Sequence, residues 1–165
     1  MSTGTPDRQR LAVWKGYLRS YTTVMRALER ELQTAHALSI AEYDVLIHLH
    51  NAPAQRARMG DLAEAVLFST GGLTRLLDRL ECAGLVARER TPADRRGVFA
   101  VLTEAGRTRL RAASVTHLRG IQEHFAAALH EDEIAPVEAF LARLNARASV
   151  LSDTSCVTEG DPARP

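Results

Sequence analysis

The chain contains few of the residues that cross-link a protein or hold it in a membrane. Its 165 residues include two cysteines and one lysine, and no long apolar run occurs. Two thiols are too few for a disulfide framework, and the lack of a long apolar run argues against a membrane span. The first six residues lack the apolar core of a signal peptide. With 45% hydrophobic residues, we expect one cytoplasmic domain or two small intertwined ones.

Sequence patterns typical of catalysis or metal binding are also missing. The chain has no phosphate-binding glycine-rich loop with a following lysine and no nucleophile elbow. His117 and His124 lie seven positions apart, about 10.5 Å along a helix, which is too far to share an ion without other ligands. We therefore expect no enzyme, no cofactor and no metal site. Cys82 leaves a thiol sensor open, although an inert thiol is the favoured interpretation.

Charge is nearly balanced overall but unevenly distributed along the chain. The formal net charge is +1. Residues 53–111 carry eleven arginines against seven acids, whereas residues 112–165 carry four arginines against eight acids. Because a basic excess can replace counterions on phosphates, the middle segment is the candidate for binding nucleic acid.

The same middle segment has the pattern of two helices separated by a short break. Apolar residues recur at helical spacing within 59–67 and again within 73–80. Asp61 and Ser69 are the predicted N-caps, since both side chains can accept hydrogen bonds from first-turn amides. One helix would pack, and the next could enter a DNA groove.

The second of these helices is predicted to begin with two glycines. Gly71 and Gly72 fall in its first turn, where each costs about 1 kcal/mol relative to alanine. They either loosen the start of the helix or allow the backbone to approach DNA closely, and both interpretations stay open. Gly84 is predicted to end the helix.

Two strand-like runs follow, with a polar segment between them. Val86–Arg90 and Val98–Leu102 flank Thr91–Gly97, which predicts a β-hairpin with a polar tip. Arg95 and Arg96 in this tip have little to pack against within their own domain. In a winged helix-turn-helix they would reach the phosphate backbone or the minor groove.

Longer helices are predicted on both sides of this segment. The first runs from about Asp7 to Ala35 with a heptad stripe: Leu11, Trp14, Leu18, Tyr21, Met25, Leu28 and Leu32. So long a stripe favours association between chains. The next helix spans about 40–51, where Ser39 and Glu42 form a capping box.

The C-terminal part of the chain contains two more predicted helices. Thr103 is the N-cap of the first, and the second has Asp132, Glu133 and Pro136 in its first turn and ends near Val150. The segment 152–165 is polar and aperiodic, so we expect a disordered tail.

The middle segment contains a series of short motifs: Leu62-Ala63, Ser69, Leu73-Thr74-Arg75, Asp78-Arg79-Leu80-Glu81, Gly84-Leu85-Val86, Arg88, Asp94-Arg95-Arg96 and Leu102-Thr103-Glu104-Ala105-Gly106. In these motifs the chain resembles the MarR family of winged helix-turn-helix transcriptional regulators. The resemblance implies a mainly α fold with a small β-hairpin wing, in an intertwined homodimer with a helical dimerisation region. It assigns residues 7–52 and 107–151 to dimerisation and 53–106 to DNA binding.

The resemblance also implies which residues contact double-stranded DNA. Those expected in the major groove are Ser69, Thr70, Gly71, Thr74 and Arg75, with Arg95 and Arg96 on the wing. Arg79, Arg88 and Arg90 are expected to position the protein on phosphates. A two-fold dimer would then recognise a pseudo-palindromic operator. Gly71-Gly72 departs from the family, which commonly carries longer side chains there.

Regulators similar to this chain typically release DNA when a small molecule, often an aromatic anion, enters a crevice beside the dimerisation helices. The candidate residues for its wall are Trp14, Tyr17, Tyr21, Tyr43, His50 and His117. Plain core or dimer packing remains the alternative for each of them. We accordingly expect a ligand-responsive repressor, with an architectural or effector-independent DNA-binding protein as the alternative.

Overall fold

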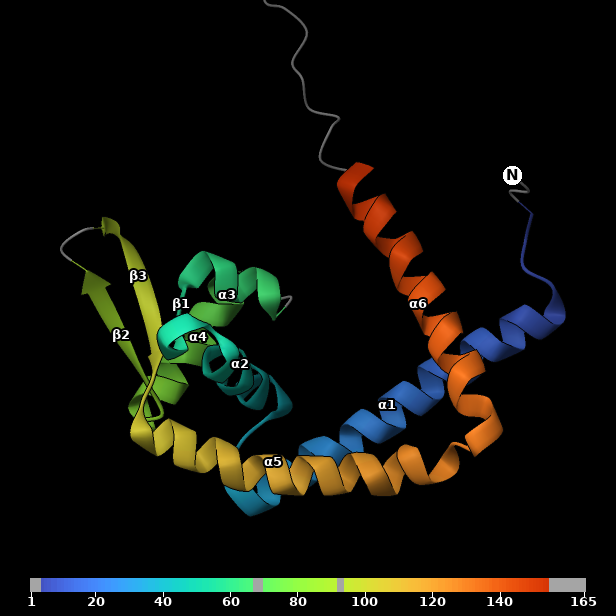
Figure 1. Cartoon of the computed structure of the whole chain (residues 1–165), viewed down its shortest axis with the longest axis horizontal. Helices are drawn as coiled ribbons and strands as arrows, with labels where there is room; N and C mark the ends of the chain where they lie inside the picture. The colour runs from blue at the N-terminus through green and yellow to red at the C-terminus, as the bar shows by residue number, and fades with distance from the viewer. Residues whose placement is uncertain (1–3, 67–69, 92–93, 155–165) are drawn as a thin grey trace, which may run out of the picture. The chain divides into compact units, whose positions relative to one another are not determined.

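The computed structural model describes residues 4–66, 70–91 and 94–154, and for residues 70, 90, 91, 94–97 and 148–154 the description is limited to the backbone. The chain divides into two compact units, Met1–Phe125 and Ala126–Pro165. The main elements of the first unit are α1 (Arg8–His36), α2 (Ile40–Asn51), β1 (Arg56–Arg58), α3 (Met59–Ala65), α4 (Thr70–Cys82), β2 (Val86–Thr91), β3 (Asp94–Leu102) and α5 (Glu104–His124), as Figure 1 shows. None of the helices in these ranges is long and apolar enough to cross a membrane.

The first two helices begin and end where local signals predict. The Asp7 side chain accepts a hydrogen bond from the Arg10 amide at 2.7 Å and so caps α1. Ala37 ends α1 in the left-handed conformation with φ 51°. At α2, the Glu42 side chain accepts from the Ser39 amide at 2.9 Å, and Ser39 Oγ accepts in return from the Glu42 amide at 3.2 Å. The predicted capping box is confirmed.

The helix pair α3–α4 contains the buried leucine stripe that the sequence predicts. Leu73 and Leu77 are fully buried, and Leu76 and Leu80 are exposed by no more than 2%. They pack with leucines of α2 and α3 and with Ala100 of β3 in one apolar core. The winged-helix region therefore covers its own core within one chain.

The predicted caps of these two helices have different outcomes. Asp61 does not cap α3; it lies inside the first turn, and Arg58 occupies the N-cap position without a side-chain cap. The reason is that β1 runs directly into α3, so the helix begins three residues earlier than the polar signal suggested. Ser69 lies outside the described residues.

A three-stranded antiparallel sheet carries the hairpin, in the order β1-β3-β2. Val86 pairs with Leu102, and Arg58 pairs with Phe99 on the other side of β3. Two predictions need correction here. Asp94–Gly97 belongs to β3 instead of the loop, and β1 was not predicted because three residues carry too little alternation to identify a strand.

The junction between the hairpin and α5 brings backbone segments very close together. Thr103 Oγ1 donates to the Gly84 carbonyl at 2.7 Å and accepts from the Gly106 amide at 3.0 Å, so Thr103 is the N-cap of α5 as predicted. A Cβ on Gly106 would lie 2.1 Å from the Leu85 carbonyl oxygen. Gly84 has φ 71° and ends the α4 segment, which is the predicted glycine C′ position.

The second unit contains a short 3-10 turn, Ala126–Ala128, and the helix α6, Glu131–Thr154. Its first turn holds Glu131, Asp132 and Glu133, whereas Pro136 lies further inside the helix. The helix continues through Thr154, so the first three residues of the predicted tail are helical. Residues 155–165 lie outside the described part of the chain.

Candidate nucleic-acid interface

The solvent side of α4 presents a small polar surface opposite its leucines. Thr74 and Arg75 are exposed, as is Gly71 at the start of the helix. A Cβ built on Gly71 would meet nothing within 4 Å, so packing inside the chain does not require glycine there. In the described part of the chain, no hydrogen bond or ion pair engages the Arg75 guanidinium. Arg75 is therefore available to a partner outside the chain.

Arg79, one helical turn further along α4, is engaged within the domain. Its Nε donates to Glu42 Oε1 of α2 at 2.9 Å. Burial would raise the pKa of the Glu42 carboxyl, but hydrogen bonds from the Ser39 amide and from Arg79 outweigh burial and lower this pKa. The pair thus ties α4 to the capped end of α2, a role the sequence did not reveal.

Arg88 of β2 makes the densest set of polar contacts on this surface. Its guanidinium donates to Asp78 Oδ1 and to Glu81 Oε2, both at 2.6 Å, and to the Thr74 carbonyl at 3.2 Å. Burial by itself would lower the pKa of Arg88, but the carboxylates of Asp78 and Glu81 raise it above its ordinary value. Arg88 is occupied by α4, which differs from the phosphate contact expected from the sequence.

The sheet that contains the wing carries two pairs of arginines, one on β3 and one on β1. Arg95 and Arg96 lie on β3, and their side chains are outside the described part of the structure. On the neighbouring strand, Arg56 Cζ lies 4.1 Å and Arg58 Cζ 5.3 Å from the centroid of the Phe99 ring. This cation–π stack was not predicted from the sequence. The alternation Arg-Ala-Arg at 56–58 places both arginines on the same face of β1 but does not identify Phe99 as their partner.

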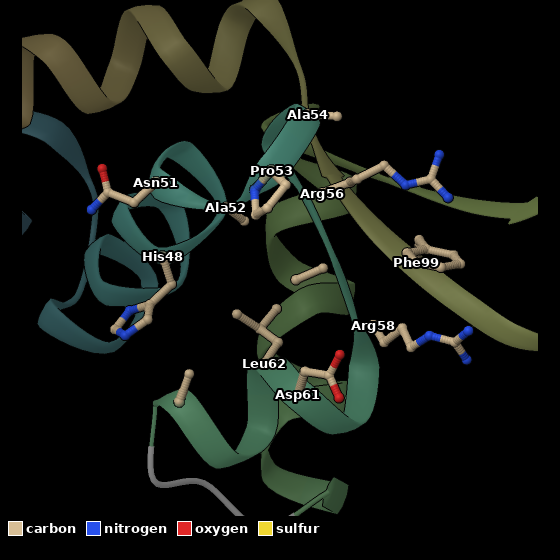
Figure 2. A pocket seen from close by; sticks show the side chains of 12 residues that line it. His48, Asn51, Ala52, Pro53, Ala54, Arg56, Arg58, Asp61, Leu62 and Phe99 are labelled. Atoms are coloured by element: carbon tan, nitrogen blue, oxygen red, sulfur yellow. The ribbon is translucent and has the colours of Figure 1, made fainter.

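A groove lies beside β1, between the C-terminal end of α2 and the helix α3. Its volume is about 760 Å³. Figure 2 shows Arg56 and Phe99 on one side of β1 and His48 and Asn51 on the other. Its walls combine apolar and polar groups in a way that suits a small molecule, but none of the predicted ligand residues lines it.

The six residues proposed for a ligand pocket have several different surroundings within the described part of the chain. Trp14 and Tyr17 stack on each other at 5.9 Å between ring centroids, and both are exposed. Tyr43 is buried, with its ring 4.6 Å from that of His117. His50 is exposed at the end of α2.

Tyr21 lines a separate cavity of about 460 Å³ between α1 and α2. Arg26 and Asp44 are on its wall. Burial raises the pKa of Asp44 and lowers the pKa of the nearby His117, while the opposite charges of the two groups act against both shifts. This cavity therefore offers an aromatic face, a cation and a carboxyl that is more easily protonated than usual.

Cys82 is exposed at the end of α4. No group of three or more metal-ligating side chains occurs among the described residues.

The arrangement of α2, β1, α3, α4 and the β2–β3 hairpin defines a winged helix-turn-helix protein. The sequence model of the MarR family matches residues 38–98 of this chain. The chain is 30% identical to AbsC, a MarR family transcriptional regulator of Streptomyces coelicolor, with a TM-score of 0.82 and coverage of 89% of this chain and 99% of AbsC. The protein belongs to the MarR family of DNA-binding transcriptional regulators.

Two further relatives agree with this assignment. Sco3205 of Streptomyces coelicolor, a MarR family regulator solved in complex with DNA, is 26% identical with a TM-score of 0.81 and coverage of 87% of this chain and 90% of Sco3205. The transcriptional regulator MhqR of Bacillus subtilis is 28% identical over 130 residues, which are 79% of this chain and 87% of MhqR. Both relatives are described as regulators of transcription.

Proposed function

We propose that the protein is a homodimeric repressor that binds a pseudo-palindromic operator and leaves it when a small molecule binds. The observation that carries the proposal is the exposed polar face of α4, where Arg75 has no partner among the described residues. An arginine fork can read a guanine edge in the major groove. That Sco3205 was solved with DNA supports a DNA-bound role for the same fold.

The residues proposed to contact DNA are those expected from the sequence, one group in the major groove and one on the wing. The major groove receives Ser69, Thr70, Gly71, Thr74 and Arg75, and the wing supplies Arg95 and Arg96. Gly71 has no packing role, which supports a close approach of the α4 backbone to DNA. Arg79 has a lesser part, since its guanidinium already binds Glu42.

A second copy of the chain is proposed to cover the apolar face of α1. Trp14, Leu18 and Tyr21 belong to one heptad stripe, yet they are 52%, 43% and 57% exposed. Exposed apolar stripes of this length mark a surface for another helix. We assign residues 7–52 and 107–151 to dimerisation and 53–106 to DNA binding. Two-fold symmetry then places half-site centres about 10 base pairs apart.

The proposed ligand is a small aromatic anion, and the α1–α2 cavity is its proposed site. Tyr21 can stack on an aromatic ring and Arg26 can pair with a carboxylate there. A ligand shifts DNA binding only if it binds the released state of the dimer better than the DNA-bound state. The remaining aromatic candidates, Trp14 and Tyr17, would reach such a site from the partner subunit.

Selection of preferred duplexes from a random pool tests the reading surface. Arg75→Ala is expected to lose about 1–3 kcal/mol of preference for the selected operator, because one bidentate base contact is removed. Arg30→Ala, an exposed arginine on α1, is the matched control for the lost charge. If Arg75→Ala kept the full operator preference, the assignment of α4 would be wrong.

Release by ligand is tested separately by screening aromatic acids for a higher melting temperature together with weaker operator binding. Arg26→Gln should abolish both effects. If no acid changes either quantity, the protein is an effector-independent DNA-binding regulator.

A further inference from the structure

The side chain of Arg88 bridges the wing and the reading helix. Arg88 pairs with Ala100 across β2 and β3, and Ala100 is fully buried, so the arm of Arg88 lies on the sheet face that covers the core. Its head emerges against α4, with the side chain 25% exposed. There it binds Asp78, Glu81 and the Thr74 carbonyl, which lie on successive turns of one face of α4.

The two carboxylates that Arg88 binds would otherwise interfere with DNA. Asp78 and Glu81 have side chains 54% and 41% exposed, on the helix proposed to enter the groove. Uncompensated carboxylates there would repel phosphates. Asp78 also follows Arg75 by three positions, a spacing at which helical side chains of opposite charge pair. An Asp78 released from Arg88 would therefore compete with DNA for the Arg75 guanidinium.

We propose that Arg88 is a positioning residue of the DNA-binding surface: by holding Asp78 and Glu81 it fixes α4 against β2 and keeps Arg75 free to read DNA. The inference rests on the proposed function, in that α4 is taken as the reading helix. It assigns Arg88 no direct contact with DNA. The cost of losing Arg88 must then come from the two acids it leaves behind.

Four versions of the chain test this prediction: wild type, Arg88→Gln, the double variant Asp78→Asn/Glu81→Gln, and the triple variant that combines all three changes. Their affinities are measured on one duplex selected with the wild-type chain. Arg88→Gln is expected to weaken binding about tenfold in the wild-type background, the size of a coupling between contacting charged groups. The same change should cost less than about threefold in the Asp78→Asn/Glu81→Gln background, since neutral amides neither repel phosphates nor capture Arg75.

Two controls separate this role from simpler ones. Arg30→Gln removes the same charge from an exposed site on α1 that lies off the heptad stripe proposed for the dimer contact, and should leave the affinity within about twofold. Arg88→Lys keeps the charge but loses the fork, and should fall between wild type and Arg88→Gln. Thermal unfolding of each variant identifies any that fail to fold, in which case Arg88→Lys is compared in both backgrounds instead.

An equal loss in both backgrounds would overturn the proposal and show that Arg88 acts through packing or by touching DNA. A direct phosphate contact would also lower the slope of log affinity against log salt concentration by about 0.9. A loss below about threefold for Arg88→Gln in the wild-type background would overturn it too. Failure of the reading helix itself is recognised independently, because Arg75→Ala would then keep the operator preference.

Discussion

Two stretches of apolar residues with similar helical spacing have opposite surroundings. In α4, Leu73 and Leu77 are completely buried by other parts of the same chain. In the first half of α1, Trp14 and Leu18 are 52% and 43% exposed. Later in the same α1 stripe, Leu32 is completely buried. The difference shows that one stripe of α1 is covered by its own chain at one end and exposed at the other.

The buried half of the α1 stripe is covered by α5. A Cβ on Gly120 of α5 would lie 2.6 Å from Leu28 Cδ2, so the two helices cross at very short distance there. His124 Nε2 and Glu31 Oε1 are 2.6 Å apart at the same crossing. Toward the other end of α1 the stripe has no such cover from α5, which agrees with the proposal that a second chain supplies it.

The largest effect is expected from truncating the buried stripe. Leu77→Ala should destabilise the chain by about 2–5 kcal/mol, because it removes a fully buried side chain and leaves a cavity. The same truncation at Leu118 of α5, which is 64% exposed, should cost far less. Urea unfolding at a protein concentration where the chain is monomeric measures both. Equal losses of unfolding free energy would mean that Leu77 and Leu118 do not differ in burial as the structure indicates.

An intermediate effect is expected from the exposed half of α1, and on association instead of folding. Leu18→Ala should weaken the proposed dimer by about 1–2 kcal/mol, as for a contact residue near the centre of an interface. Val13→Ala is the matched control, since Val13 is 62% exposed but lies off the heptad stripe. Sedimentation at several concentrations measures the dissociation constant. If both variants dissociate alike, the stripe is not the dimer contact.

The smallest effect is expected at the link between α2 and α4. Glu42→Gln should cost about 1 kcal/mol at neutral pH, since it weakens a helix cap and a pair whose arginine is largely in solvent. The pKa of Glu42 is lowered in the folded chain, so its stabilisation is complete above the ordinary glutamate pKa. It is lost as the pH falls through the lowered folded value.

The gap in unfolding free energy between wild type and Glu42→Gln should therefore close in acid. Urea unfolding across this pH range measures it, with Glu64→Gln on the exposed side of α3 as the control. A gap that widens toward acid pH would contradict the assigned role of Glu42.

Local signals predicted several elements to within a residue or two. The capping box at Ser39 and Glu42, the cap at Thr103 and the left-handed Gly84 were all recognisable from sequence, and the structure confirms each. Such signals work because the hydrogen bonds involved join residues three to five positions apart. The leucine face of α4 was equally clear, because helical periodicity alone determines which residues share a face.

Contacts between distant segments were not predictable in this way. The partners of Arg79 and Arg88 lie on other elements, and nothing near either arginine in the sequence distinguishes it from a DNA contact. β1 exists because β3 pairs with it, not because three residues prefer a strand. Nor did the sequence indicate that, within the chain, Tyr21 lines a cavity whereas the Tyr43 ring lies against that of His117.

By itself, the sequence determined the helices, several of their ends, the hairpin and the membership of a DNA-binding family, since these depend on periodicity and on hydrogen bonds between near neighbours. Only the tertiary structure decided which arginines are free and which are held, because a guanidinium binds whichever carboxylate the fold brings within reach. Arg75 and Arg88 show the distinction, because both lie in the winged helix-turn-helix segment 53–106. Folding places two carboxylates against Arg88 and, among the described residues, none against Arg75.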